Sequence, residues 1–177
     1  MDWFGIGRRL TPNERNLIEK YFPQSFDNSV IRIRKMSKRR SERLERLGST
    51  RSRGYAFRNT IWINEKYWSK YTDEIAVTNP EAAELLIHEV FHVFQYSKGM
   101  TSRRQRRFER KHGLPVLRGG VEYLWTFRET GEDQLREFKQ QGVEAQASMF
   151  AAGARHAETV EDIIDIWKAV LEYLKGL

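Results

Sequence analysis

Apolar residues recur at helical spacing in several segments of this 177-residue chain. A first helix is expected to begin at Thr11 and Pro12, because threonine caps helices, proline suits the first turn, and Glu14 completes a capping box. The same spacing predicts further helices in the second half of the chain, over about 120–129, 133–152 (with a break near Gly142) and 159–175.

Two segments carry apolar and polar residues in partial alternation, as strands do. Residues 29–36 predict a short strand with Arg32 and Arg34 on the same side, and residues 54–63 predict one continuous strand. One side of this second strand would carry Tyr55, Phe57, Asn59, Ile61 and Ile63. The predicted fold is therefore α+β and mostly helical, with a small N-terminal sheet, in a single domain over residues 1–177.

The most apolar segment of the chain contains three ionisable residues. A helix is expected to start at Asn79 and Pro80 and to end at Gly99, and residues 85–96 within it read LLIHEVFHVFQY. Side chains that can carry charge are costly to bury unless something compensates them. The segment therefore predicts a site rather than an ordinary core helix.

His88, Glu89 and His92 match the pattern HExxH. Residues four positions apart lie on one helix face, so the two imidazoles can hold one Zn²⁺, and Glu89 beside them can take a proton from a metal-activated water. The chain has no cysteine, so its zinc ligands must be histidine or carboxylate. The alternative interpretation is that both histidines are core residues with ordinary hydrogen-bond partners.

A catalytic zinc usually has three protein ligands and one open position. The segment after His92 lacks the further histidine of the metzincins. Glu144 is the favoured third ligand, because the glycine and alanines around it allow its helix to approach another helix closely. Glu122 and His112 are the alternatives, and Glu144 could also be a plain surface residue.

At these residues the sequence resembles a known family, the small bacterial zinc metallopeptidase domains that are Vgr-related or form the core of extracellular contractile injection systems. The resemblance covers roughly residues 10–155 and is carried by LTPNERNLIEKYF, SVIRIRK, GYAFRNTIWI, LLIHEVFHVFQY and EAQA. It implies a minimal gluzincin-type zincin fold, with zinc held by His88, His92 and Glu144 and with Glu89 as general base and acid. It also implies a secretion-associated effector or effector-processing protease.

Other polar residues are candidates for substrate or transition-state contacts. Gln95, three residues after the second histidine, could hydrogen-bond a ligand residue or the substrate backbone, or could simply end the apolar stretch. In the fold that the resemblance implies, the strand that carries Asn59 would border the cleft and could receive an extended substrate, although core packing alone would also explain its residues. An oxyanion-stabilising donor is also expected. The sequence does not rank the candidates for it, which are Tyr123, His112, Tyr96 and His156.

The formal net charge of +7 favours anionic partners. Lysine and arginine are concentrated in residues 32–58 and 98–111, which could follow a phosphate backbone, with Tyr55, Phe57 and Trp62 nearby to stack on bases. The rival functions are therefore a nucleic-acid-associated protein, a partner of an acidic protein, or a catalytically silent adaptor. A solvated cationic surface is favoured, because no nucleic-acid-binding motif is recognisable.

No apolar stretch has the length of a signal peptide, and none approaches the roughly 20 residues of a membrane span. We therefore expect a protein that is cytoplasmic as synthesised and that acts on a protein or peptide substrate. If the protein leaves the cell, we expect export by a non-classical secretion system.

Overall fold

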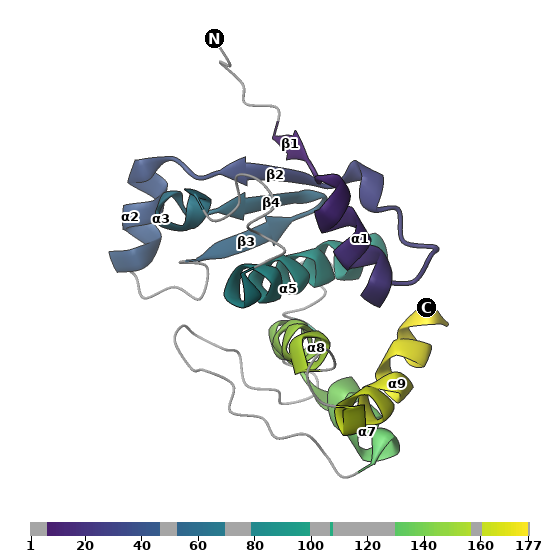
Figure 1. Cartoon of the computed structure of the whole chain (residues 1–177). Coiled ribbons are helices and arrows are strands. Elements are labelled where there is room, and N and C mark those ends of the chain that lie inside the picture. The colour runs from purple at the N-terminus through teal and green to yellow at the C-terminus, as the bar shows by residue number, and fades with distance from the viewer. Residues whose placement is uncertain are drawn as a thin grey trace.

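The computed structural model describes residues 7–46, 53–69, 79–99, 107, 130–156 and 161–176. These parts of the chain are mostly helical, with a small sheet formed by the early residues (Figure 1). The predicted α+β class is therefore confirmed. The helix expected over about 120–129 lies outside the described residues.

The sheet contains four short strands, β1 (Arg8–Arg9), β2 (Arg32–Lys35), β3 (Gly54–Phe57) and β4 (Thr60–Ile63). Their order is β1-β2-β4-β3, with β2 and β4 parallel and the two outer pairs antiparallel. Among the described residues, β3 is therefore an edge strand of the sheet.

The prediction of one continuous strand over residues 54–63 is wrong. The chain reverses after Phe57, so that β3 and β4 form a hairpin in which Tyr55 is paired with Trp62. Arg58 adopts the left-handed conformation, with φ 55°, that lets the turn close. The sequence hides this turn because its two central residues, Arg58 and Asn59, include no glycine.

The helices are α1 (Pro12–Tyr21), α2 (Lys38–Arg46), α3 (Glu65–Trp68), α5 (Pro80–Ser97), α7 (Gly131–Gln140), α8 (Val143–His156) and α9 (Glu161–Lys175). The capping box predicted for α1 is present, since Thr11 Oγ1 accepts from the Glu14 amide at 3.2 Å and the Glu14 carboxylate accepts from the Thr11 amide at 2.8 Å. A 3-10 turn (Asn28–Val30) replaces the start of the strand predicted over 29–36. The break expected near Gly142 separates α7 from α8.

Helix α5 lies between the sheet and α8 (Figure 1). Ile33, Ile61 and Ile63 are fully buried in the core that the sheet shares with α5. On its other side α5 contacts α8, where the rings of Phe91 and Phe150 have centroids 4.7 Å apart. Residues on opposite faces of α5 can therefore reach the sheet and α8.

Within the described ranges, the helices are either too short or too polar to cross a lipid bilayer.

Candidate metal centre

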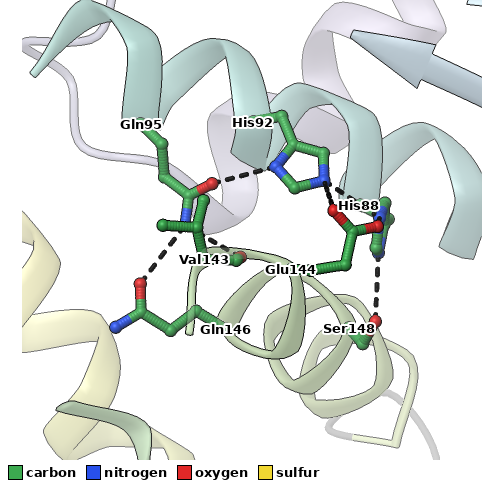
Figure 2. A network of polar contacts seen from close by, with 7 residues as sticks. All are labelled: His88, His92, Gln95, Val143, Glu144, Gln146 and Ser148. Atoms are coloured by element: carbon green, nitrogen blue, oxygen red, sulfur yellow. Dashed lines mark hydrogen bonds and ion pairs between the residues drawn. The ribbon is translucent and has the colours of Figure 1, made fainter. Parts of the chain in front are cut away.

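The structure brings His88 and His92 of α5 together with Glu144 from the first turn of α8 (Figure 2). The two imidazole Nε2 atoms are 3.2 Å apart. Oε1 of Glu144 lies 3.3 Å from Nε2 of His88, and Oε2 lies 3.2 Å from Nε2 of His92. Each pair of these three side chains thus brings ligand atoms to within 3.2–3.3 Å of one another, with a different carboxylate oxygen of Glu144 facing each histidine, and we call this group of side chains the triangle.

The dimensions of this triangle suit a zinc ion. Atoms bound tetrahedrally at about 2.0–2.2 Å from zinc lie roughly 3.3–3.5 Å from one another, close to the distances among His88, His92 and Glu144. The side chains are partly exposed, at 17%, 13% and 34% respectively, so solvent reaches the group. Two imidazoles and one carboxylate are also a donor set that zinc prefers, and the residues present therefore fit the metal.

Small side chains on α8 explain how Glu144 comes so close to α5. Ala147 and Ala151 are buried in the core that α8 shares with α5. Glu144 itself lies at the N-terminal end of α8, where the helix dipole favours a carboxylate. The packing of α8 therefore delivers a short acidic side chain to the histidine face of α5.

Charge is balanced within the metal-free group. Burial by itself lowers the pKa of His92, but the Glu144 carboxylate, with smaller contributions from Glu89 and Gln95, raises it to about 9. Burial raises the pKa of Glu144, but His92 and His88 hold this pKa well below its usual range. At neutral pH a proton on His92 thus provides positive charge where a cation would be held.

Gln95 supports His92 from behind the triangle (Figure 2). It is 3% exposed, and its Oε1 lies 2.9 Å from Nδ1 of His92. A proton donated by Nδ1 to this oxygen leaves Nε2 directed toward Glu144 and available for a metal. The structure therefore places Gln95 against a histidine that could be a metal ligand.

The amide of Gln95 also ties α5 to α8. Its Nε2 donates to the carbonyl of Val143 at 3.1 Å and to Oε1 of Gln146 at 3.2 Å. Gln146 in turn donates to the carbonyl of Phe138 at 3.0 Å, in the last turns of α7. One relay of amide groups therefore fixes His92 and the start of the helix that carries Glu144.

Ser148 contributes a contact that the sequence analysis missed. Its Oγ lies 3.5 Å from Nδ1 of His88, on the side of the ring away from the triangle (Figure 2). Ser148 is four residues after Glu144 and so lies one turn away on the same face of α8. This spacing is the signal from which the contact could have been found.

Glu89 lies beside the triangle rather than in it. Its side chain is 3% exposed and points toward the start of β3. A Cβ atom added to Gly54 would lie 3.3 Å from Oε1 of Glu89. The carboxylate is also close enough to His92 to raise the pKa of that residue, so Glu89 lies between the edge strand and the histidines.

Three other residues singled out in the sequence, Asn59, Tyr96 and His156, do not join this group. Asn59 lies in the β3–β4 turn, where its carbonyl accepts from the Arg32 amide at 2.9 Å. The ring of Tyr96 packs against Phe57, with centroids 6.3 Å apart. His156 is exposed at the far end of α8 and, being twelve residues after Glu144, lies about 18 Å along the helix from it. His112, Glu122 and Tyr123 lie outside the described residues.

No protein-family model, curated protein or solved structure matches this chain.

Proposed function

We propose that the protein is a zinc-dependent metallopeptidase with a gluzincin-type zincin fold. The observation that carries this proposal is the group of His88, His92 and Glu144, whose closest ligand atoms lie 3.2 to 3.3 Å apart, as the ligands of one zinc ion do. The HExxH spacing adds a carboxylate, Glu89, next to these ligands. Together they are the groups that metal-assisted peptide hydrolysis requires.

Each residue has a distinct task in the proposed reaction. A zinc ion bound here would polarise the substrate carbonyl and lower the pKa of water to about 7. Glu89 accepts a proton from the attacking water while the water oxygen bonds to the carbonyl carbon of the substrate. Glu89 then delivers that proton to the leaving nitrogen as the C–N bond breaks. Gln95 keeps His92 in the orientation and tautomer that leave Nε2 free for the metal.

The edge strand β3 offers a way to position the substrate. An extended peptide can add to the free edge of a sheet through main-chain hydrogen bonds. The closeness of Gly54 to Glu89 means that a peptide along β3 would pass next to the proposed general base. This arrangement supports a polypeptide substrate rather than a small hydrolysable molecule.

The proposal is tested by the metal content and peptidase activity of three purified proteins. The wild type should bind one zinc ion and cleave peptides in a mixed library. Glu89→Gln should retain zinc and lose cleavage by a factor of about 100 or more, whereas His92→Ala should lose both. Glu84→Gln, which alters a partly exposed glutamate of the same helix that pairs with Arg155 at 2.7 Å, is the matched control and should behave as the wild type.

Three results would contradict the assignment. Full activity of Glu89→Gln, or loss of its zinc, would remove the role given to Glu89. A wild type that binds zinc but cleaves no peptide would favour the alternative of a catalytically silent adaptor with the same fold.

The resemblance described above suggests a biological setting for this activity. A peptidase of the Vgr-related type would act as a secretion-associated effector or as a protease that processes effectors. In this setting the protein would be made in the cytoplasm and exported by a dedicated secretion machine.

A further inference from the structure

A row of cationic and aromatic side chains crosses the face of the sheet that points away from α5. Trp62 is the register partner of Arg34 on one side and of Tyr55 on the other, so the three residues form a line across β2, β4 and β3. The rings of Tyr55 and Trp62 are stacked, with centroids 6.3 Å apart and planes 10° apart. The row ends at the edge strand.

Arginine side chains cover these rings. The guanidinium of Arg40, from α2, lies 4.8 Å from the centroid of Tyr55 and 5.7 Å from that of Trp62, and the guanidinium of Arg34 lies 5.3 Å from the Trp62 ring. A guanidinium stacked on a ring keeps its N–H groups available at its edge for a carboxylate or phosphate. In the parts of the chain that the structure describes, no acidic side chain forms an ion pair with Arg34 or Arg40.

Helix α2 adds positive charge beside the row. Its inner side faces α3 and the loop before it, where Ser41 accepts from the Glu65 amide at 3.2 Å and Glu45 accepts from the Asn64 side chain at 3.2 Å. Helical spacing places three exposed arginines on the opposite side, namely Arg39, Arg43 and Arg46. One acidic residue of α2 is thus turned inward, and the exposed face is dominated by arginine.

The position of the row relative to Glu89 indicates which side chains of a bound peptide could reach it. Gly54 faces Glu89 on the α5 side of the sheet, and the next residue, Tyr55, belongs to the row on the opposite side. Successive residues of a strand point to opposite faces. In a peptide paired with β3, the side chain next to Tyr55 would therefore meet Arg40, while its neighbours in sequence would point toward the metal side.

We propose that Arg34, Arg40, Tyr55 and Trp62 form a specificity subsite that selects an aspartate or glutamate side chain in the substrate. The inference rests on the proposed peptidase function, which it deepens by naming acidic polypeptides as the substrate class. A carboxylate suits the subsite better than a nucleobase, because guanidinium groups already lie over the rings on which a base would stack. A polypeptide can also pair with β3, which a nucleic acid cannot.

The test measures peptide binding by the full-length, zinc-loaded Glu89→Gln protein, which should not consume its ligand. The probes are a fluorescein-labelled extended peptide with aspartate and glutamate at alternate positions and its counterpart with asparagine and glutamine. Fluorescence anisotropy at low salt should show about fivefold tighter binding of the acidic peptide. Replacing both arginines (Arg34→Gln with Arg40→Gln) should abolish this preference while leaving the affinity for the neutral peptide unchanged.

Arg136→Gln is the control for the loss of an arginine elsewhere, because it removes one positive charge from an exposed site on α7, and it should keep the preference. Equal binding of the two peptides, or a preference that survives the double substitution, would overturn the subsite. Tighter binding of single-stranded oligothymidylate than of the acidic peptide, lost in the same double variant, would also overturn it and assign the surface to nucleic acid. If arginine-dependent binding is found but the wild type cleaves no peptide, the peptidase function fails and the acid-binding subsite stands.

Discussion

Gly54 shows how a single missing side chain shapes the proposed active site. The strand passes so close to α5 that a Cβ atom at this position would lie 3.3 Å from Oε1 of Glu89 and 3.2 Å from the carbonyl oxygen of Trp62. Either the strand or the carboxylate would have to shift. Gly54 therefore allows the proposed general base to lie directly against the strand that would receive the substrate.

We expect Gly54→Ala to lower kcat by about tenfold, since small displacements of a catalytic group are costly. The zinc content should not change, because Gly54 does not contact the ligands. Peptide hydrolysis and metal analysis on the same sample measure both quantities. The control is Gly176→Ala, where an added Cβ atom would meet only ordinary contacts of 3.5 Å or more. An unchanged kcat in Gly54→Ala would contradict the placement of Glu89.

His92 makes the stability of the metal-free protein depend on pH. Its pKa is about 9 in the folded chain, against an ordinary value of 6.5. A raised pKa stabilises the folded state fully below the unfolded value, and this contribution is lost as the pH rises through the folded value. The Tm of chelator-treated protein should therefore fall between about pH 6.5 and pH 9.5, as His92 loses its proton.

The matched comparison is His92→Gln, which removes the titrating group. The Tm of this variant, measured by circular dichroism over the same pH range, should decrease less than the Tm of the wild type. Zinc-loaded wild type should also lack that part, since a bound cation takes the place of the proton. A wild-type Tm that rises over this range relative to the variant would contradict the ion pair with Glu144.

At the scale of elements, Gln95 connects the two helices that supply the ligands. It contacts His92 on α5 and the first residue of α8 at the same time. We expect Gln95→Leu to weaken zinc binding by about 10- to 100-fold, because partners behind a ligand histidine fix its ring and tautomer. Competition with a chromogenic chelator measures the Kd for zinc. The control is Gln140→Leu, which alters an exposed glutamine on α7 and should leave the Kd unchanged. Equal Kd values for the two variants would show that the relay through Gln95 is dispensable.

The elements predicted well are those specified by their own residues. The capping box at Thr11 and Glu14 and the start of α5 at Asn79 and Pro80 are local signals, and both helices begin where these signals stand. The β3–β4 hairpin was missed because its left-handed residue is Arg58, which the sequence gives no reason to choose. Turns without glycine or a proline signal are closed by the surrounding packing, which a single sequence does not display.

The candidate site was likewise predictable only where local sequence signals specify it. His88 and His92 share one helix, so their spacing alone predicts a shared face. The approach of Glu144 could be expected from its alanine-rich surroundings, although Glu122 and His112 were not excluded. The relay through Gln95, Val143 and Gln146 could not be predicted, because it depends on the exact rotation of α8 against α5.

At the scale of the whole molecule, the centre lies between two layers of structure. The sheet packs on one side of α5, and α8 with α7 and α9 lies on the other (Figure 1). Two of the candidate ligands come from α5 and the third from α8. A bound metal would therefore hold these layers together, and its removal would weaken the contact between them.

We expect zinc to raise the free energy of unfolding by about 4 kcal/mol when free zinc is about a thousandfold above its Kd. Urea unfolding of chelator-treated and zinc-loaded protein measures this difference. Glu144→Gln should lose most of the gain, because an amide is a weaker ligand than a carboxylate, whereas Glu132→Gln on the exposed side of α7 should keep it. An undiminished gain in Glu144→Gln would show that the third ligand lies elsewhere.

The distance in sequence between the histidines and Glu144 also matters while the protein is being made. A nascent chain that has left the ribosome only as far as α5 carries two of the three ligands and no means of completing the set. If zinc is bound as proposed, its ligand set would be complete only after α8 has been translated and has docked. Unfinished products would then lack the proposed peptidase activity, which would spare the proteins of the producing cell.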